Sequence, residues 1–199
     1  MKTIIKNILK ALHLYLPLVN WHNRNVRKKH HRKKQLPLLD FKRRFKYNIF
    51  VETGTFRGEM VEAMRKKFKK IYSIELADVL YERAREKFGK YSHIRLLHGD
   101  SAVELPKILT EIDEPAIFWL DAHYSGGETA RGETNTPIER EIRAIFAHPI
   151  KNHVILIDDA GDFDPKYEYP TATSVERLAR ENNYSFDMVE NIFRIYPKT

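Results

Sequence analysis

The chain has 199 residues, 42% of them hydrophobic, which suits one domain with a buried core and is too short for two full domains. The absence of cysteine excludes disulfide scaffolds, thiolate zinc sites, iron–sulfur clusters and cysteine nucleophiles. The formal net charge of +8 is unevenly distributed, because residues 1–46 hold 14 Lys and Arg and a single acidic residue, Asp40. This asymmetry predicts a basic arm over residues 1–46 and a separate domain over residues 47–199.

Within the basic arm, apolar residues between Ile4 and Leu16 recur at helical spacing, with lysines on another stripe. Such a helix, followed by the basic run over residues 27–34, is typical of segments that bind an anionic membrane surface. We expect this contact to lie in residues 1–36, with Pro37 ending the arm. Packing of the helix on the domain with solvated charges, and contact with RNA or DNA, are the alternatives.

The hydrophobic stretch near the N-terminus is shorter than the roughly 20 apolar residues that span a bilayer. It is interrupted by His13 and Pro17, and no signal-peptide cleavage site follows before the basic run. The sequence therefore favours a cytoplasmic protein, with peripheral attachment to a membrane through the arm as a further expectation. It does not predict an oligomeric state.

From Asn48 onward, short β-rich segments alternate with helical patterns, which is typical of a parallel sheet covered by helices. The sequence predicts strands over residues 48–52, 71–75, 93–98, 115–121, 153–158, 184–189 and 192–196. It predicts helices over residues 57–69, 78–89, 101–111, 136–147 and 172–182. Only Glu190 and Asn191 separate the last two strands, so we expect an α/β sheet closed by an antiparallel strand.

The first predicted strand runs into a helix through a turn that contains two glycines. Gly54 allows a tight turn, and Gly58 allows close approach at the helix start, where free N–H groups favour a polar ligand. Glu75 ends the second strand, where an acidic side chain typically accepts the ribose hydroxyls of a nucleotide-like cofactor. Asp100, after the third strand, is placed to reach the adenine end. An ordinary turn with a solvated Glu75 and a dinucleotide site are the alternatives.

These features resemble class I S-adenosylmethionine (SAM)-dependent methyltransferases over residues 48–196. The resemblance implies a Rossmann-like, doubly wound sheet of seven strands in the order 3-2-1-4-5-7-6, with strand 7 antiparallel. The residues that it assigns to SAM binding are Glu52, Thr53, Gly54, Thr55, Phe56, Gly58, Glu75, Leu76, Gly99, Asp100, Ser101 and Asp121. Phe56 stands where many members have glycine. An aromatic residue there is found in metal-dependent O-methyltransferases similar to catechol O-methyltransferase and to the macrocin and novobiocin sugar O-methyltransferases.

Three aspartates follow two predicted strands that the resemblance makes neighbours. Asp121 ends one strand, and Asp158 and Asp159 end the other. Carboxylates at the same sheet edge repel one another unless a positive charge lies among them, and Mg²⁺ prefers such oxygen ligands. The metal-dependent subgroup has the same pattern, and its metal lowers the pKa of an acceptor hydroxyl and orients it toward the SAM methyl. The alternative is that Asp159 caps a turn and Asp158 bonds local backbone.

The segment after Asp121 supplies the candidate residues for acid–base chemistry and acceptor selection. His123 is the candidate general base beside Asp121, with a structural hydrogen bond or metal ligation as alternatives. Residues 124–135 are predicted to form a lid over the sheet edge, with Tyr124 and Arg131 available to the acceptor. Tyr124 and Asp162 are the substitutes for His123.

The sequence thus predicts a SAM-dependent, Mg²⁺-assisted O-methyltransferase that acts on a hydroxyl of a sugar, glycan or related polyol. A metal-free methyltransferase is one alternative, and an RNA or DNA methyltransferase that binds phosphates through the arm is another. A non-catalytic, membrane-associated protein of Rossmann-like fold is the third. Residues 121–124 lack the Asn/Asp-Pro-Pro-aromatic motif of base N-methyltransferases, which disfavours nucleic acid as the acceptor.

Overall fold

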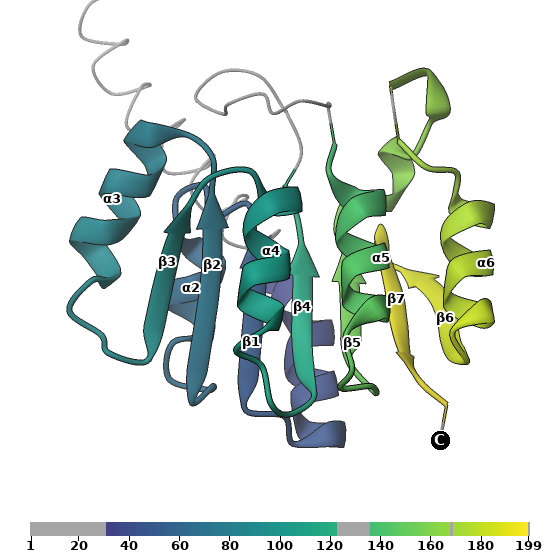
Figure 1. Cartoon of the computed structure of the whole chain (residues 1–199), viewed down its shortest axis with the longest axis horizontal. Coiled ribbons are helices and arrows are strands. Elements are labelled where there is room, and N and C mark those ends of the chain that lie inside the picture. Colours follow the sequence, from purple (N-terminus) through teal and green to yellow (C-terminus); the bar gives the residue numbers. More distant parts are fainter. Residues whose placement is uncertain (1–30, 123–135, 168, 199) are drawn as a thin grey trace, which may run out of the picture.

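The computed structural model describes residues 31–122, 136–167 and 169–198 (Figure 1). The predicted helix between Ile4 and Leu16, the candidate base His123 and the predicted lid lie outside the described residues. Among the helices that the structure does describe, we find none with the length and apolar character needed to cross a membrane.

A seven-stranded sheet forms the centre of the molecule, and its strand order, β3-β2-β1-β4-β5-β7-β6, confirms the predicted topology. The strands are β1 (Ile49–Thr53), β2 (Lys70–Glu75), β3 (Ile94–His98), β4 (Ala116–Leu120), β5 (Val154–Ile157), β6 (Tyr184–Val189) and β7 (Ile192–Pro197). The first five pair in parallel, whereas β7 runs antiparallel to both β5 and β6. The central strands β1, β4 and β5 are buried along their whole length, because helices cover both faces.

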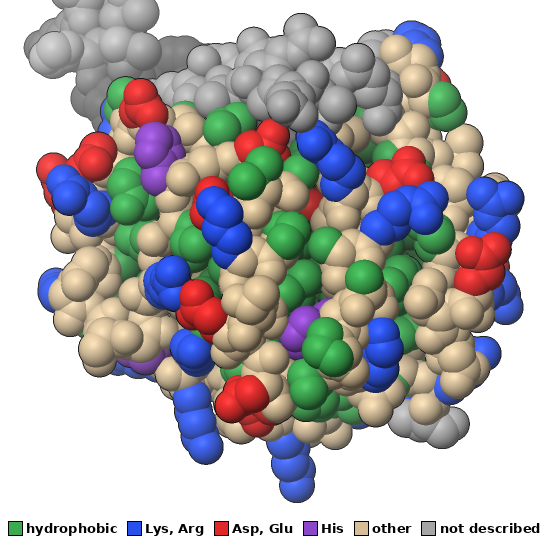
Figure 2. All heavy atoms as spheres, in the orientation of Figure 1, with side chains coloured by type: hydrophobic (Ala, Val, Ile, Leu, Met, Phe, Trp, Pro, Cys, Tyr) green, Lys and Arg blue, Asp and Glu red, His purple; other side chains and the backbone are tan. Residues whose placement is uncertain are grey.

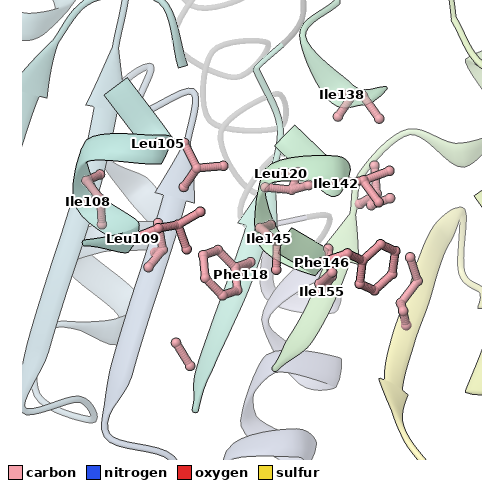
Figure 3. Close-up of a cluster of buried hydrophobic side chains, with 14 of the residues drawn as sticks. Leu105, Ile108, Leu109, Phe118, Leu120, Ile138, Ile142, Ile145, Phe146 and Ile155 are labelled. Carbon is pink, nitrogen blue, oxygen red and sulfur yellow. The ribbon is translucent and has the colours of Figure 1, made fainter. Parts of the chain in front are cut away.

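Helices lie on both faces of the sheet (Figure 1). They are α2 (Glu59–Met64), α3 (Asp78–Phe88), α4 (Ser101–Leu109), α5 (Ile138–Ala147) and α6 (Ala172–Glu181), together with a helical segment over residues 31–45. One hydrophobic cluster joins α4, α5 and α6 to the sheet, and Figure 3 shows its centre around Phe118 and Ile142. A second cluster joins α2, α3 and the segment 31–45 to the other face.

The α5 helix illustrates how the local sequence produces this arrangement. Ile138, Ile142 and Ile145 recur at helical spacing and are all buried against the sheet. Pro137 stands at the N-cap of the helix, and the hydroxyl of Thr136 before it accepts the backbone N–H of Ile138 at 3.4 Å. On the face covered by α4, α5 and α6, basic and acidic side chains are interspersed (Figure 2).

The segment over residues 31–45 corrects one expectation. Pro37 was expected to end the arm, but the backbone is helical on both sides of it and continues to residue 45. Leu38 is 0% exposed and Phe41 is 4% exposed, and the ring of Phe41 lies 5.1 Å from that of Tyr196. Burial of this apolar stripe offsets the hydrogen bond that proline cannot make. The division of the chain into arm and domain stays a prediction.

The helix predicted over residues 57–69 is also shorter than expected. The α2 helix ends at Met64, and turns over residues 65–67 lead toward β2. Phe68, which extended the apolar pattern of the helix, is buried instead against Phe50 of β1, with ring centroids 5.3 Å apart. The apolar residues at helical spacing therefore lie partly in a short helix and partly in the turn segment that follows it.

Candidate functional site

The turn after β1 brings the backbone close to the end of β4. Gly54 has φ +83°, and a Cβ on it would lie 2.5 Å from the carbonyl oxygen of Asp121. Gly58 has φ +67°, and a Cβ there would lie 2.4 Å from the ring of Phe88. Both positions therefore require glycine, as the sequence predicted, for conformation and for space. Phe56, between them, adopts φ 48° and is 40% exposed.

A buried hydrogen-bond network connects this turn to strands β1 and β2. The hydroxyl of Ser73 donates to Glu52 Oε2 at 2.6 Å and lies 2.6 Å from the hydroxyl of Thr55. Burial raises the pKa of Glu52 to about 8, and the nearby charge of Glu75 adds to this, while the Ser73 hydrogen bond opposes it. Glu52 therefore holds its proton at neutral pH.

Glu75 ties the end of β2 to the same turn. Its Oε2 accepts the backbone N–H of Phe56 at 2.7 Å, and its Oε1 accepts that of Ala77 at 2.9 Å. Burial raises the pKa of Glu75, and the backbone N–H groups of Ala77, Phe56 and Leu76 oppose the rise. A carboxylate has about four lone-pair sites, so Glu75 keeps capacity for a further donor, such as a hydroxyl.

The remaining predicted cofactor residues lie at the ends of neighbouring strands. The Leu76 carbonyl is 3.2 Å from Nε2 of His98, and Gly99 has φ +149° at the end of β3. Asp100 caps α4, since its Oδ1 accepts the N–H of Ala102 at 2.8 Å, and Ser101 is buried at the start of that helix. The fold thus brings the set together along one edge of the sheet, where open α/β sheets bind ligands.

A pocket lies at this edge. Its walls include Glu52, Gly54, Phe56, Met60, Trp119 and Asp121. His31 and Lys34, from the segment 31–45, also line it. Part of the predicted arm therefore forms one wall of the pocket.

The three predicted metal ligands form a compact cluster beside the pocket. Asp121, Asp158 and Asp159 each offer a carboxylate oxygen, and these oxygens lie within 4.8 Å of one another. Burial raises the pKa of Asp121 well above its usual value, and the charge of Asp158 adds to the rise. Burial likewise raises the pKa of Asp158. Asp159 has φ 52°, and its Oδ1 accepts a hydrogen bond from Nδ2 of Asn191 at 3.4 Å.

Lys34 lies on this cluster, and the sequence analysis did not anticipate it. Its ammonium donates a hydrogen bond to Oδ2 of Asp158 and lies 3.7 Å from Oδ1 of Asp159. Burial disfavours the charged form of Lys34, but the hydrogen bond to Asp158 and the charges of all three aspartates outweigh it, so that its pKa is raised. A lysine side chain therefore supplies a positive charge at the position where the sequence predicted Mg²⁺.

Glu141 of α5 is a buried acid that was not predicted from the sequence. It is 0% exposed, and burial raises its pKa to about 7, while the neighbouring hydroxyls of Ser101 and Thr53 oppose the rise. The sequence carried a signal for it, because position 141 falls three residues after Ile138 on the apolar stripe of the helix.

Three predicted site residues, His123, Tyr124 and Arg131, lie outside the described residues. Their roles as general base and acceptor contacts stay predictions. Asp162, named as a substitute base, lies in a short 3₁₀ helix after β5 and is exposed.

No protein-family model matches the sequence, and no curated protein matches it either. The fold is similar to that of NodS, an N-methyltransferase from Bradyrhizobium japonicum WM9, at 14% identity and a TM-score of 0.58, over 85% of this chain and 98% of that chain. CalS10, an amino pentose methyltransferase from Micromonospora echinaspora, matches at 11% identity and a TM-score of 0.57, over 83% of this chain and 91% of that chain.

The methyltransferase domain of bacterial CtHen1 matches at 12% identity and a TM-score of 0.56, over 85% of this chain and 100% of that chain. CalS10 was solved with SAM bound, and NodS also in complex with S-adenosylhomocysteine (SAH). At these identities the likeness extends to the fold. The chain therefore has the Rossmann-like fold that these methyltransferases share.

Proposed function

We propose that this protein is a SAM-dependent methyltransferase. The observation that carries the proposal is the hydrogen bond between the turn after β1 and Glu75. The backbone N–H of Phe56 donates to Oε2 of Glu75 at 2.7 Å. It puts a buried acid beside a glycine turn at the edge where such folds bind nucleotide-like ligands. The fold shared with SAM- and SAH-bound enzymes supports the same conclusion.

The chain's own residues would hold and orient the cofactor. Gly54 lets the turn pack against the backbone of Asp121, and Glu75 would accept ribose hydroxyls with its remaining acceptor capacity. Asp100, at the end of β3, would face the adenine end. Bound SAM supplies an electrophilic methyl group, and the neighbouring walls of the pocket would exclude water from it.

We further propose that the methyl acceptor is a hydroxyl of a sugar, glycan or related polyol. The oxygens of Asp121, Asp158 and Asp159 suit a hard divalent cation such as Mg²⁺ in number and spacing. A cation held there would lower the pKa of the acceptor hydroxyl. His123 would accept the proton, and Tyr124 and Arg131 would contact the acceptor. CalS10, which shares the fold, acts on an amino pentose.

The basic arm suggests where the acceptor is found. We propose that residues 1–36 contact an anionic membrane surface, so that an acceptor carried near that surface is favoured. Arg32 and Lys33 are exposed in the part of this segment that the structure describes. Sedimentation with vesicles tests this: binding should rise with the anionic lipid fraction and fall with salt. Equally salt-sensitive binding to RNA alone would favour a nucleic-acid acceptor instead.

Calorimetric titration with SAH tests the cofactor half of the proposal. We expect micromolar binding to the wild-type protein and at least a tenfold loss in Glu75→Ala, because the ribose hydroxyls lose their acceptor. Glu82→Ala removes an exposed carboxylate from α3 and is the matched control, with unchanged affinity. Thermal melts establish that both variants fold. If the wild-type protein binds no SAH, with or without Mg²⁺, the proposal is wrong.

A further inference from the structure

We infer that Lys34 is a tethered cation that competes with divalent metal ions for the cluster of Asp121, Asp158 and Asp159. The inference rests on the metal site in the proposed function and concerns the control of that site. In this account the cluster has two states, one neutralised by the lysine and the other by a metal ion.

Lys34 lies at the place where a metal ion would bind. The Lys34 ammonium donates to Oδ2 of Asp158 and lies 3.7 Å from Oδ1 of Asp159. These carboxylates are two of the three groups whose oxygens lie within 4.8 Å of one another. A metal ion bound by the same oxygens would have to lie where the ammonium now lies.

Electrostatic repulsion keeps an ammonium and a metal ion from occupying this cluster together. The Asp158 side chain is 1% exposed and that of Lys34 is 19% exposed, so water screens this pair only weakly. A divalent ion and an ammonium in contact with the same carboxylates would repel each other at short range. The two cations therefore exclude one another, and metal binding requires the Lys34 side chain to move away.

The helix that carries Lys34 is anchored to the sheet. Leu38, one helical turn after Lys34, is 0% exposed, and Phe41 is 4% exposed in the cluster that joins the helix to the sheet. This anchoring holds Lys34 beside the cluster at a high effective concentration. An intramolecular competitor of this kind weakens metal binding without any change in the ligands.

Two neighbouring contacts attach the start of the described helix to the same edge. Lys33 Nζ lies 3.0 Å from Oε2 of Glu190, and Nδ1 of His31 lies 3.9 Å from Oε2 of Glu59. Of these three side chains, Lys34 is the one that contacts a buried carboxylate, that of Asp158. Displacement of Lys34 by a metal should therefore loosen the helix where it lines the pocket, and the metal state would differ from the lysine state in access to that pocket.

Direct binding of Mn²⁺ tests the inference, with Mn²⁺ as the probe for a hard divalent cation. Free Mn²⁺ is measured by electron paramagnetic resonance in titrations of the full-length wild-type protein and of Lys34→Met, which keeps an unbranched apolar side chain but removes the charge. We expect Lys34→Met to bind Mn²⁺ at least tenfold more tightly than the wild-type protein. Lys33→Met, which removes the adjacent exposed cation, should bind like the wild-type protein, and Asp158→Asn should bind more weakly.

Equal or weaker Mn²⁺ binding in Lys34→Met would overturn the inference, and so would the absence of binding to both proteins. SAH titration of the same samples keeps the outcomes distinct, because intact SAH binding leaves the methyltransferase proposal standing. A second measurement uses the wild-type protein alone. Mn²⁺ should increase amide hydrogen exchange over residues 31–36, and unchanged or slower exchange at saturating Mn²⁺ would contradict displacement of Lys34.

Discussion

Two groups of buried carboxyls lie at the same edge of the sheet, and they avoid repulsion by different means. Below the turn after β1, Glu52 retains its proton and is hydrogen-bonded by Ser73, which comes from the neighbouring strand. At the ends of β4 and β5, Lys34 forms an ion pair with Asp158, which is 124 residues away in the sequence, and lies close to Asp159. The first arrangement needs only the sheet, whereas the second depends on a segment from outside it.

The two groups of carboxyls should respond differently to pH and to substitution. A protonated carboxyl is sensitive to pH and tolerant of a neutral isostere. An ion pair is sensitive to loss of either partner, because the remaining charge stays buried. The following predictions test this contrast.

The largest effect is expected for Glu52. Its folded-state pKa of about 8 lies above the usual 4.5, so its contribution to stability is complete below pH 4.5 and is lost as the pH rises through 8. As the pH rises from below 4.5 to above 8, the free energy of unfolding of the wild-type protein should fall by about 5 kcal/mol relative to Glu52→Gln, from the difference between the two pKa values at about 1.4 kcal/mol per unit. Urea denaturation at a series of pH values measures it. Parallel pH profiles for the two proteins would show that Glu52 is ionised in the folded state.

A smaller effect is expected for Lys34. Lys34→Met should lower the free energy of unfolding at pH 7 by about 2 kcal/mol, because the aspartates lose their counter-charge. Lys33→Met is the matched control, since the Lys33–Glu190 pair is more than half exposed on both sides and should change stability by less than about 0.5 kcal/mol. Denaturation with urea, which does not screen charge, distinguishes them. Equal stabilities for the two variants would contradict a counter-charge role for Lys34.

Most of the sheet could be predicted from the sequence for a physical reason. Strands such as β4 and β5 are buried on both faces, so they form continuous apolar runs bounded by polar residues. The β6–β7 pair followed from its two-residue connection, which excludes a crossover helix. The length of α2 could not be predicted, because Phe68 continues the helical pattern although it packs after the helix has ended.

The site was predicted in part. The sequence placed Asp121, Asp158 and Asp159 at one edge and called for a positive charge among them, because carboxylates follow adjacent parallel strands. It did not identify Lys34, since a lysine within a run of basic residues carries no local sign of a buried partner. Pro37 also disfavoured the prediction of a helix over residues 31–45, the segment that carries Lys34. Glu141 could have been found from its place on the apolar stripe of α5.

We expect a SAM-like cofactor to bind where the turn after β1 meets Glu75. Amide hydrogen exchange with and without SAH tests it most directly, because it locates the ligand without requiring the acceptor. With SAH bound, we predict slower amide exchange over residues 52–60 and 74–77 and unchanged exchange at the ends of β6 and β7. SAH binding that leaves the turn and the end of β2 unprotected, or protects a different region, would contradict the account.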